Sequence, residues 1–190
     1  MAMRSARPAT LTLCALLAML AGQSATAAPP AQTRYHNERW GFCIAYPSIL
    51  LPYEGVNKAG VSLTYPSDRH GRNPITVGAL PNMESSSEPG RQMTLEENAD
   101  SDFASIGDGE VPPLRNVRVV SKKEILLAGI PALRMQVTYT RQGVERMEDT
   151  IYAIKDHAVY SLELKCRLRD RTQYEETFRS VMESFQWGCR

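Results

Sequence analysis

Three histidines and their acidic neighbours are the residues of this chain that suggest metal or acid–base chemistry. His70 lies two residues from Asp68 in a segment rich in turn-forming residues, so one loop offers two adjacent metal ligands. A structural zinc site uses four ligands and a catalytic one uses three, so this pair does not make a site. We interpret these two residues, together with His36 and His157, as solvated polar residues. The sequence therefore predicts no metal centre.

Four carboxylates gather within one predicted helix, and they are Glu96, Glu97, Asp100 and Asp102. Paired catalytic carboxylates need different environments across a cleft to separate their roles. Neighbours on a single helix are typical of its solvated face, and near the helix start their charge stabilises by about 0.3–1 kcal/mol. The chain also contains no nucleophile elbow, zinc-peptidase, phosphate-loop or EF-hand motif. We therefore predict a protein that is not an enzyme and binds no cofactor.

The cysteines predict one disulfide in an oxidising compartment. Cys43, Cys166 and Cys189 lie beyond the N-terminal leader, and three cysteines allow one disulfide and one free thiol. Cys166 shares a strand face with Leu162 and Leu164, which predicts a buried and unreactive thiol. Because the last helix runs back along that strand, it carries the chain end away from Cys166. The predicted disulfide is therefore Cys43–Cys189.

Residues 1–27 have the organisation of a secretory signal peptide. A charged start is followed by an uncharged apolar run and a small-residue cleavage site. These features are Arg4, Arg7, residues 11–20 and Ala25-Thr26-Ala27. A membrane anchor is one alternative, but the run is shorter than the roughly 20 residues that span a bilayer. A lipoprotein anchor at Cys14 is another, but bulky Leu13 precedes it. We therefore expect a periplasmic or secreted protein without stable membrane insertion.

The charge balance argues against nucleic acid as a partner. The chain has 22 Lys and Arg residues against 21 Asp and Glu residues. A nucleic-acid-binding or anionic-membrane-binding domain normally carries a clear basic excess. We expect a protein partner instead.

The remaining chain shows the periodicities of one α+β domain. Residues 28–34 are predicted to be a disordered lead, and residues 35–190 a single domain. Alternating apolar residues predict a mostly antiparallel sheet, because one side of several strands is polar. The predicted strands are residues 39–46, 61–65, 75–80, 117–120, 125–127, 133–139, 146–154 and 159–168.

Two amphipathic helices complete the pattern. Thr94 and Glu97 form a capping-box signature at the start of the first helix, and Thr172 and Glu175 form another before the second. The second helix carries an apolar stripe, which predicts packing against the sheet. That stripe comprises Tyr174, Phe178, Val181, Met182 and Phe185.

Short motifs at both ends and in the middle of the domain resemble the PsbP-like superfamily, which includes PsbP and DcrB-like bacterial envelope proteins. They are Asn37-x-x-Trp40-Gly41-Phe42-x-Ile44-x-Tyr46-Pro47, Gly129-Ile130-Pro131-Ala132 and Ser184-Phe185. The resemblance implies an α/β/α arrangement, with an antiparallel sheet flanked by helices. It also implies an accessory or partner-binding role, with no catalytic residues to transfer. Cys43 replaces the usual serine-like residue, which suggests a disulfide particular to this branch.

Three functions fit these observations. The first is an exported, non-enzymatic accessory or protein-partner-binding protein of the bacterial envelope. The second is a periplasmic immunity protein that neutralises a delivered toxin, and the third, less favoured, is a small-ligand carrier. Function in such domains is usually carried on loops. The candidate contact loops are residues 53–60, 67–73 and 82–90.

Overall fold

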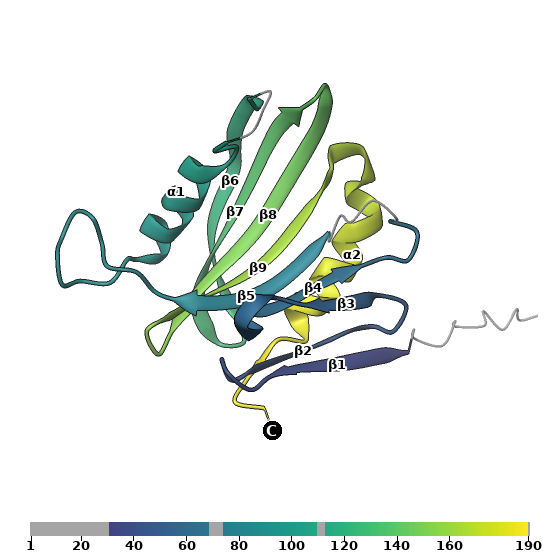
Figure 1. Ribbon diagram of the computed structural model, residues 1–190, viewed down its shortest axis with the longest axis horizontal. Helices are drawn as coiled ribbons and strands as arrows, with labels where there is room; N and C mark the ends of the chain where they lie inside the picture. Colours follow the sequence, from purple (N-terminus) through teal and green to yellow (C-terminus); the bar gives the residue numbers. More distant parts are fainter. Residues whose placement is uncertain (1–30, 69–73, 110–112, 190) are drawn as a thin grey trace, which may run out of the picture.

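The computed structural model describes residues 31–68, 74–109 and 113–189 (Figure 1). The predicted signal peptide, residues 1–27, lies outside these residues. The strands are β1 (Gln32–Asn37), β2 (Phe42–Pro47), β3 (Leu51–Glu54), β4 (Gly60–Thr64), β5 (Ile75–Pro81), β6 (Arg115–Leu127), β7 (Ile130–Arg141), β8 (Val144–Lys155), β9 (Ala158–Arg167) and β10 (Gln186–Trp187). The α-helices are α1 (Leu95–Ser105) and α2 (Arg171–Glu183), and short 3₁₀ turns cover Val56–Lys58 and Leu168–Asp170.

Seven strands form one antiparallel sheet in the order β3-β4-β5-β9-β8-β7-β6. The two strands predicted at residues 117–120 and 125–127 are parts of β6, which is interrupted by two register irregularities. A second sheet, β1-β2-β10, brings the chain end beside β2. The predicted antiparallel α+β fold is thereby confirmed.

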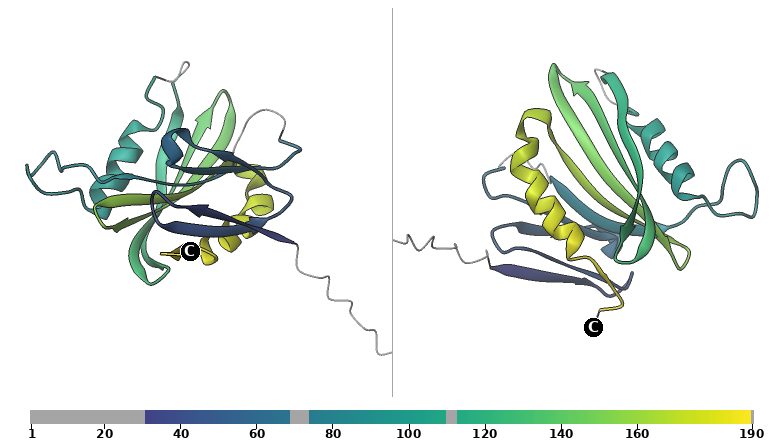
Figure 2. Two further views of the ribbon diagram at one scale, coloured as in Figure 1. Left: turned by 60° about the horizontal axis from the view of Figure 1, so that its bottom comes forward. Right: turned by 180° about the vertical axis from the view of Figure 1, so that it is seen from behind.

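The two helices pack on opposite faces of the large sheet (Figure 1; Figure 2, right). Helix α2 buries Phe178 and Val181 against the face that carries Leu162 and Leu164 of β9. The small sheet contributes to the same core, for example through Phe42. In the part of the chain that the structure describes, neither helix is long and apolar enough to cross a membrane.

Helix α1 covers the other face over β7 and β8. Its start is the predicted capping box, because the Thr94 side chain accepts a hydrogen bond from the Glu97 N–H and the Glu97 carboxylate accepts one from the Thr94 N–H. Ala99 is fully buried against Leu133 and Met135 of β7. Together the helices and the sheet form the α/β/α arrangement that the sequence motifs predict.

Strand β1 begins at Gln32, so the prediction of a disordered lead over residues 28–34 is wrong from Gln32 onward. The strand pairs along its whole length with β2. Most of its side chains are exposed, and its order comes from main-chain hydrogen bonds rather than from apolar burial. For that reason the segment shows no alternation of apolar residues. Residues 28–30 lie outside the described residues.

The second predicted capping box is also wrong. Helix α2 starts at Arg171, and its N-cap, Asp170, makes no side-chain cap hydrogen bond. The 3₁₀ turn Leu168–Asp170 runs directly into the helix, and the Arg171 N–H bonds to the Leu168 carbonyl. Thr172 is therefore already inside the helix, and Glu175 forms an i,i+4 ion pair with Arg171 at 3.0 Å instead.

Candidate functional site

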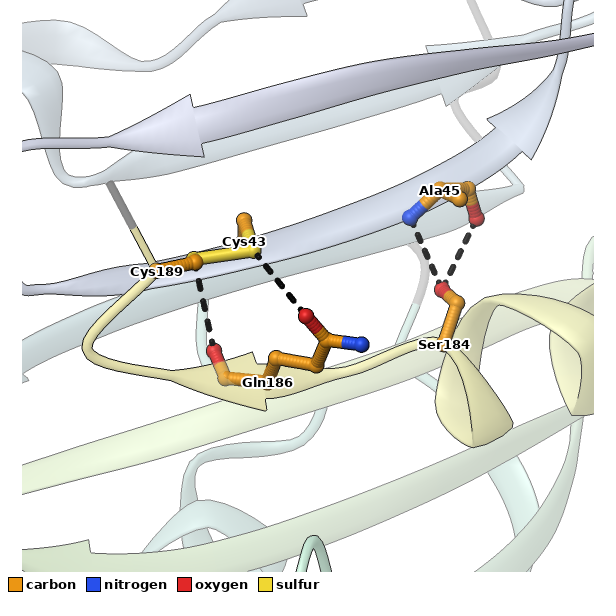
Figure 3. Close-up of a disulfide and its surroundings, with 5 residues drawn as sticks. All are labelled: Cys43, Ala45, Ser184, Gln186 and Cys189. Carbon is orange, nitrogen blue, oxygen red and sulfur yellow. Dashed lines mark hydrogen bonds between the residues drawn. A yellow bond between two sulfur atoms is a disulfide. The ribbon is translucent and has the colours of Figure 1, made fainter.

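A disulfide joins Cys43 of β2 to Cys189, the same pair that the sequence predicts (Figure 3). Cys166 is the free and buried thiol. The disulfide lies beside the short pairing of β10 with β2. Ser184 adds a further tie, because its Oγ accepts a hydrogen bond from the Ala45 N–H at 2.8 Å (Figure 3). This arrangement fastens the chain end to the small sheet and indicates a structural disulfide.

The histidines do not converge on a site. His36 is exposed on β1, and His157 lies in a turn with its Nδ1 3.1 Å from the Gln92 amide oxygen. Asp68 accepts hydrogen bonds from the Tyr174 hydroxyl, while His70 lies outside the described residues. Among the residues that the structure describes, no group of three His, Cys, Asp or Glu side chains could hold a metal ion.

Three of the four carboxylates of α1 make specific contacts, so the sequence-based interpretation of a simple solvated face is incomplete. Glu97 binds Arg91 through paired hydrogen bonds of 2.8 Å, and Asp100 pairs with Lys122 at 2.7 Å. Asp102 accepts a hydrogen bond from the hydroxyl of Tyr152 on β8. Glu96 is exposed and best fits the sequence-based interpretation of a solvated face.

A groove of about 280 Å³ lies between α1, the end of β5 and the uncovered part of β9, and we call it the α1 groove. Its lining includes the apolar residues Leu80, Met83 and Met93, which we call the apolar rim. Met83 and Met93 are held side by side, because the Met93 N–H bonds to the Met83 carbonyl at 2.8 Å. Leu80 is 59% exposed and Met83 is 63% exposed. These two side chains are therefore available for contact at the mouth of the groove.

Short side chains from both α1 and the sheet line the groove. Helix α1 contributes Ser101 and Ser105, and the sheet contributes Thr150 and Ser161. Since α1 packs over β7 and β8, β9 is left partly open on this face. Residues from β5, α1 and β9 thus meet at one concave surface.

Two carboxylates, Asp102 and Glu163, are the charged residues of the groove lining. Burial, followed by the hydrogen bond to Asp102, raises the pKa of Tyr152 well above its ordinary value. Tyr152 therefore remains protonated and acts as a hydrogen-bond donor, not as a base. Glu163 forms an ion pair with Lys165.

A smaller pocket of about 170 Å³ adjoins Cys166, Asp68 and Tyr174. Burial raises the pKa of the Cys166 thiol to about 11. At neutral pH the thiol is protonated, and a protonated buried thiol is a poor nucleophile. This pocket therefore does not assemble an activated cysteine.

Sequence reasoning located part of the groove but not the groove itself. Met83 belongs to the loop 82–90 that was predicted as a contact surface, and the loop extends from the body of the molecule beside α1 (Figure 1). That loop is tied down by Arg91, which binds the side chains of Ser85, Glu88 and Glu97. The contact loop predicted at 53–60 includes the end of β3, and residues 69–73 of the third loop lie outside the described residues. The sequence feature that could have located the apolar rim is the pair Met83 and Met93, which lie one on each side of a polar loop.

The seven-stranded antiparallel sheet with a helix on each face and a small sheet closing one core defines an α+β fold of the PsbP-like type. Over 88% of this chain and 98% of the other, the structure is similar to cyanobacterial PsbP (CyanoP) from Synechocystis sp. PCC 6803, with a TM-score of 0.59 and 11% identity. The PsbP-like resemblance of the sequence is therefore confirmed at the level of the fold.

Two further solved structures align less well. LpqN, involved in cell envelope biogenesis of Mycobacterium tuberculosis, aligns over 82% of this chain and 90% of its own, with a TM-score of 0.46 and 17% identity. PA94 from Pseudomonas aeruginosa aligns over 80% and 94%, with a TM-score of 0.43 and 12% identity. No family model matches the sequence, and no curated protein matches it.

Proposed function

We propose that this chain is an exported, non-enzymatic accessory protein of the bacterial envelope that binds a protein partner through the α1 groove. The observation that carries the proposal is the exposure of Leu80 and Met83 at the mouth of a concave surface. Exposed apolar side chains that border a cleft are typical of interaction sites. Methionine in particular adapts its shape and polarisable sulfur to a bound surface.

Export is supported by two independent features. Residues 1–27 have the pattern of a signal peptide, and Cys43 and Cys189 form a disulfide. Structural disulfides persist in the periplasm and outside the cell, where the environment is oxidising. Both features support a periplasmic or secreted location.

A binding role is favoured over catalysis by the state of the ionisable groups. Catalytic groups usually have pKa values near the working pH. Here burial raises the pKa of both Tyr152 and Cys166 away from neutrality. The groove volume of about 280 Å³ lies at the lower limit of small-ligand pockets, roughly 300–1,000 Å³. Contact with a few side chains of a partner therefore fits better than carriage of a small ligand.

The test is affinity capture from periplasmic extract with tagged residues 28–190, compared between groove and control variants. We expect Met83→Glu to abolish capture of a stoichiometric protein that the unmodified chain retains. Ile49→Glu is the matched control, because Ile49 is 62% exposed and is not among the groove residues. Equal capture by both variants would contradict the proposal. A captured toxin would select the immunity role within it.

A further inference from the structure

We infer that the occupant of the α1 groove is an extended segment of the partner protein that carries a basic side chain next to an apolar one. The Lys or Arg side chain would bind Asp102 and Glu163, and the apolar side chain would contact Leu80 and Met83. This inference rests on the proposed partner-binding function, and it adds the chemistry of the segment that binds.

The first argument is the sign of the charge in the groove. Both charged lining residues are acidic. The nearby cation, Lys165, is shared, because it pairs with Glu163 and also with Glu148 at 3.5 Å. Lys165 therefore offsets at most one of the two lining charges, while Asp102 is bonded to the neutral hydroxyl of Tyr152. The lining keeps a net negative charge, and charge complementarity favours a cationic group in the occupant.

The second argument is the state of Asp102. Tyr152 donates one hydrogen bond to its Oδ2, and a carboxylate has about four acceptor positions. Tyr152 stays protonated, so it fixes the carboxylate without neutralising its charge. A guanidinium or ammonium group could therefore add charge-assisted hydrogen bonds to an acceptor that is already held in place.

The third argument is the mixed chemistry of the groove lining. Leu80, Met83 and Met93 are apolar, whereas Ser101, Ser105 and Asp102 of α1 are polar. A wholly apolar segment would bury the polar residues without hydrogen bonds, which is unfavourable. A wholly basic segment would leave the rim without apolar contact. A mixed basic and apolar segment satisfies both sets of residues.

The experiment is a selection of random displayed 12-residue peptides on immobilised residues 28–190, followed by affinity measurements with the enriched peptides. We expect enriched sequences to combine Lys or Arg with an aliphatic or aromatic residue. We expect Asp102→Asn combined with Glu163→Gln to weaken their binding by about tenfold or more, since charge-assisted hydrogen bonds are roughly twice as strong as neutral ones. Both substitutions keep the shape of the side chain.

The matched control is Glu96→Gln, which removes an exposed charge from the same helix outside the groove lining. It should change the affinity by less than about twofold, as expected for a surface charge. If Met83→Glu abolishes peptide binding but the double charge variant does not, the charge inference is wrong and the groove still binds. If no enriched peptide depends on the groove, the inference is overturned, while the capture experiment tests the proposed function separately.

Discussion

The hydroxyl of Tyr152 on β8 donates a hydrogen bond to the carboxylate of Asp102 on α1. This contact links the helix to the sheet beside the α1 groove, over a separation of 50 residues. The same hydrogen bond holds α1 against the sheet and fixes the position of a charged group in the groove. A change in either residue should therefore affect both stability and binding.

We expect Tyr152→Phe to lower the free energy of unfolding by about 1.5–3 kcal/mol, the range for a hydrogen bond to a charged group. The ring remains to pack in the core cluster beneath α1. Urea unfolding measures the change. Tyr53→Phe is the control, because Tyr53 is 54% exposed on the edge strand β3. Equal unfolding midpoints for both variants would show that the Asp102 contact does not stabilise the fold.

Loss of the disulfide should destabilise the domain strongly. Cys43 and Cys189 are separated by 146 residues. A loop of that size constrains the unfolded chain by about 5 kcal/mol in the chain-entropy model, and removal of native disulfides typically costs about 2–5 kcal/mol. We expect Cys189→Ser and the reduced protein to unfold at similar, lower urea concentrations. Denatured, unreduced residues 28–190 should titrate as one thiol, and a count of three would contradict the pairing.

The Cys166 thiol should resist alkylation in the native state. Burial raises its pKa from 9.0 to about 11, so little thiolate is present at pH 8. Because the folded pKa lies above the unfolded one, the associated stability is complete below about pH 9 and is lost as the pH rises through about 11. Mass spectrometry after iodoacetamide treatment measures the reaction. Rapid native-state labelling at pH 8 would show that the thiol is accessible and ionised.

The loop between β5 and α1 should depend on Arg91. Its guanidinium binds Glu97, Glu88 and Ser85, and Lys cannot reproduce this fork geometry. We expect Arg91→Ala and Arg91→Lys both to increase proteolytic cleavage within residues 82–92. The natural protein and Ile49→Glu serve as references. If Arg91→Lys is as resistant as the natural protein, charge rather than geometry holds the loop.

The same cluster predicts a pH dependence. Hydrogen bonds from Arg91, and then from Ser85, hold the pKa of Glu97 well below its usual range. A lowered folded pKa stabilises the protein above the unfolded value of about 4.5, and this contribution is lost as the pH falls through the folded value. An NMR titration should show Glu97 still ionised at pH 3. Protonation near pH 4.5 would contradict the contact.

Arg134 and Asp149 form an ion pair in which the carboxylate is buried. Arg134 donates hydrogen bonds of 2.8 and 2.6 Å to the two oxygens of Asp149, which is 1% exposed, and Gln136 donates a third at 2.7 Å. We expect Arg134→Met to cost about 3–5 kcal/mol, because it leaves a buried charge with too few partners. Arg134→Met combined with Asp149→Leu should recover part of this loss in urea unfolding. No recovery would show that packing, rather than the unpaired charge, causes the loss.

The elements that were predictable from sequence are those whose signal is local. Side chains alternate along β9 and repeat with helical spacing along α2, so burial on one face leaves its pattern in the residue order. The Thr94 capping box needs only residues within one turn, and it forms as predicted. The Thr172 box has the same residue types but fails, because the preceding 3₁₀ turn had already started the helix.

By itself, the sequence determined the antiparallel sheet, the two amphipathic helices, the resemblance to PsbP-like proteins and the choice of Cys43 and Cys189 as partners. Only the tertiary structure decided that β1 adds to the small sheet, because its pairing uses main-chain groups that every residue has. Only the tertiary structure likewise produced the α1 groove. Leu80, Asp102 and Glu163 lie far apart in the chain, and their meeting depends on where α1 packs across the sheet, which no local pattern encodes.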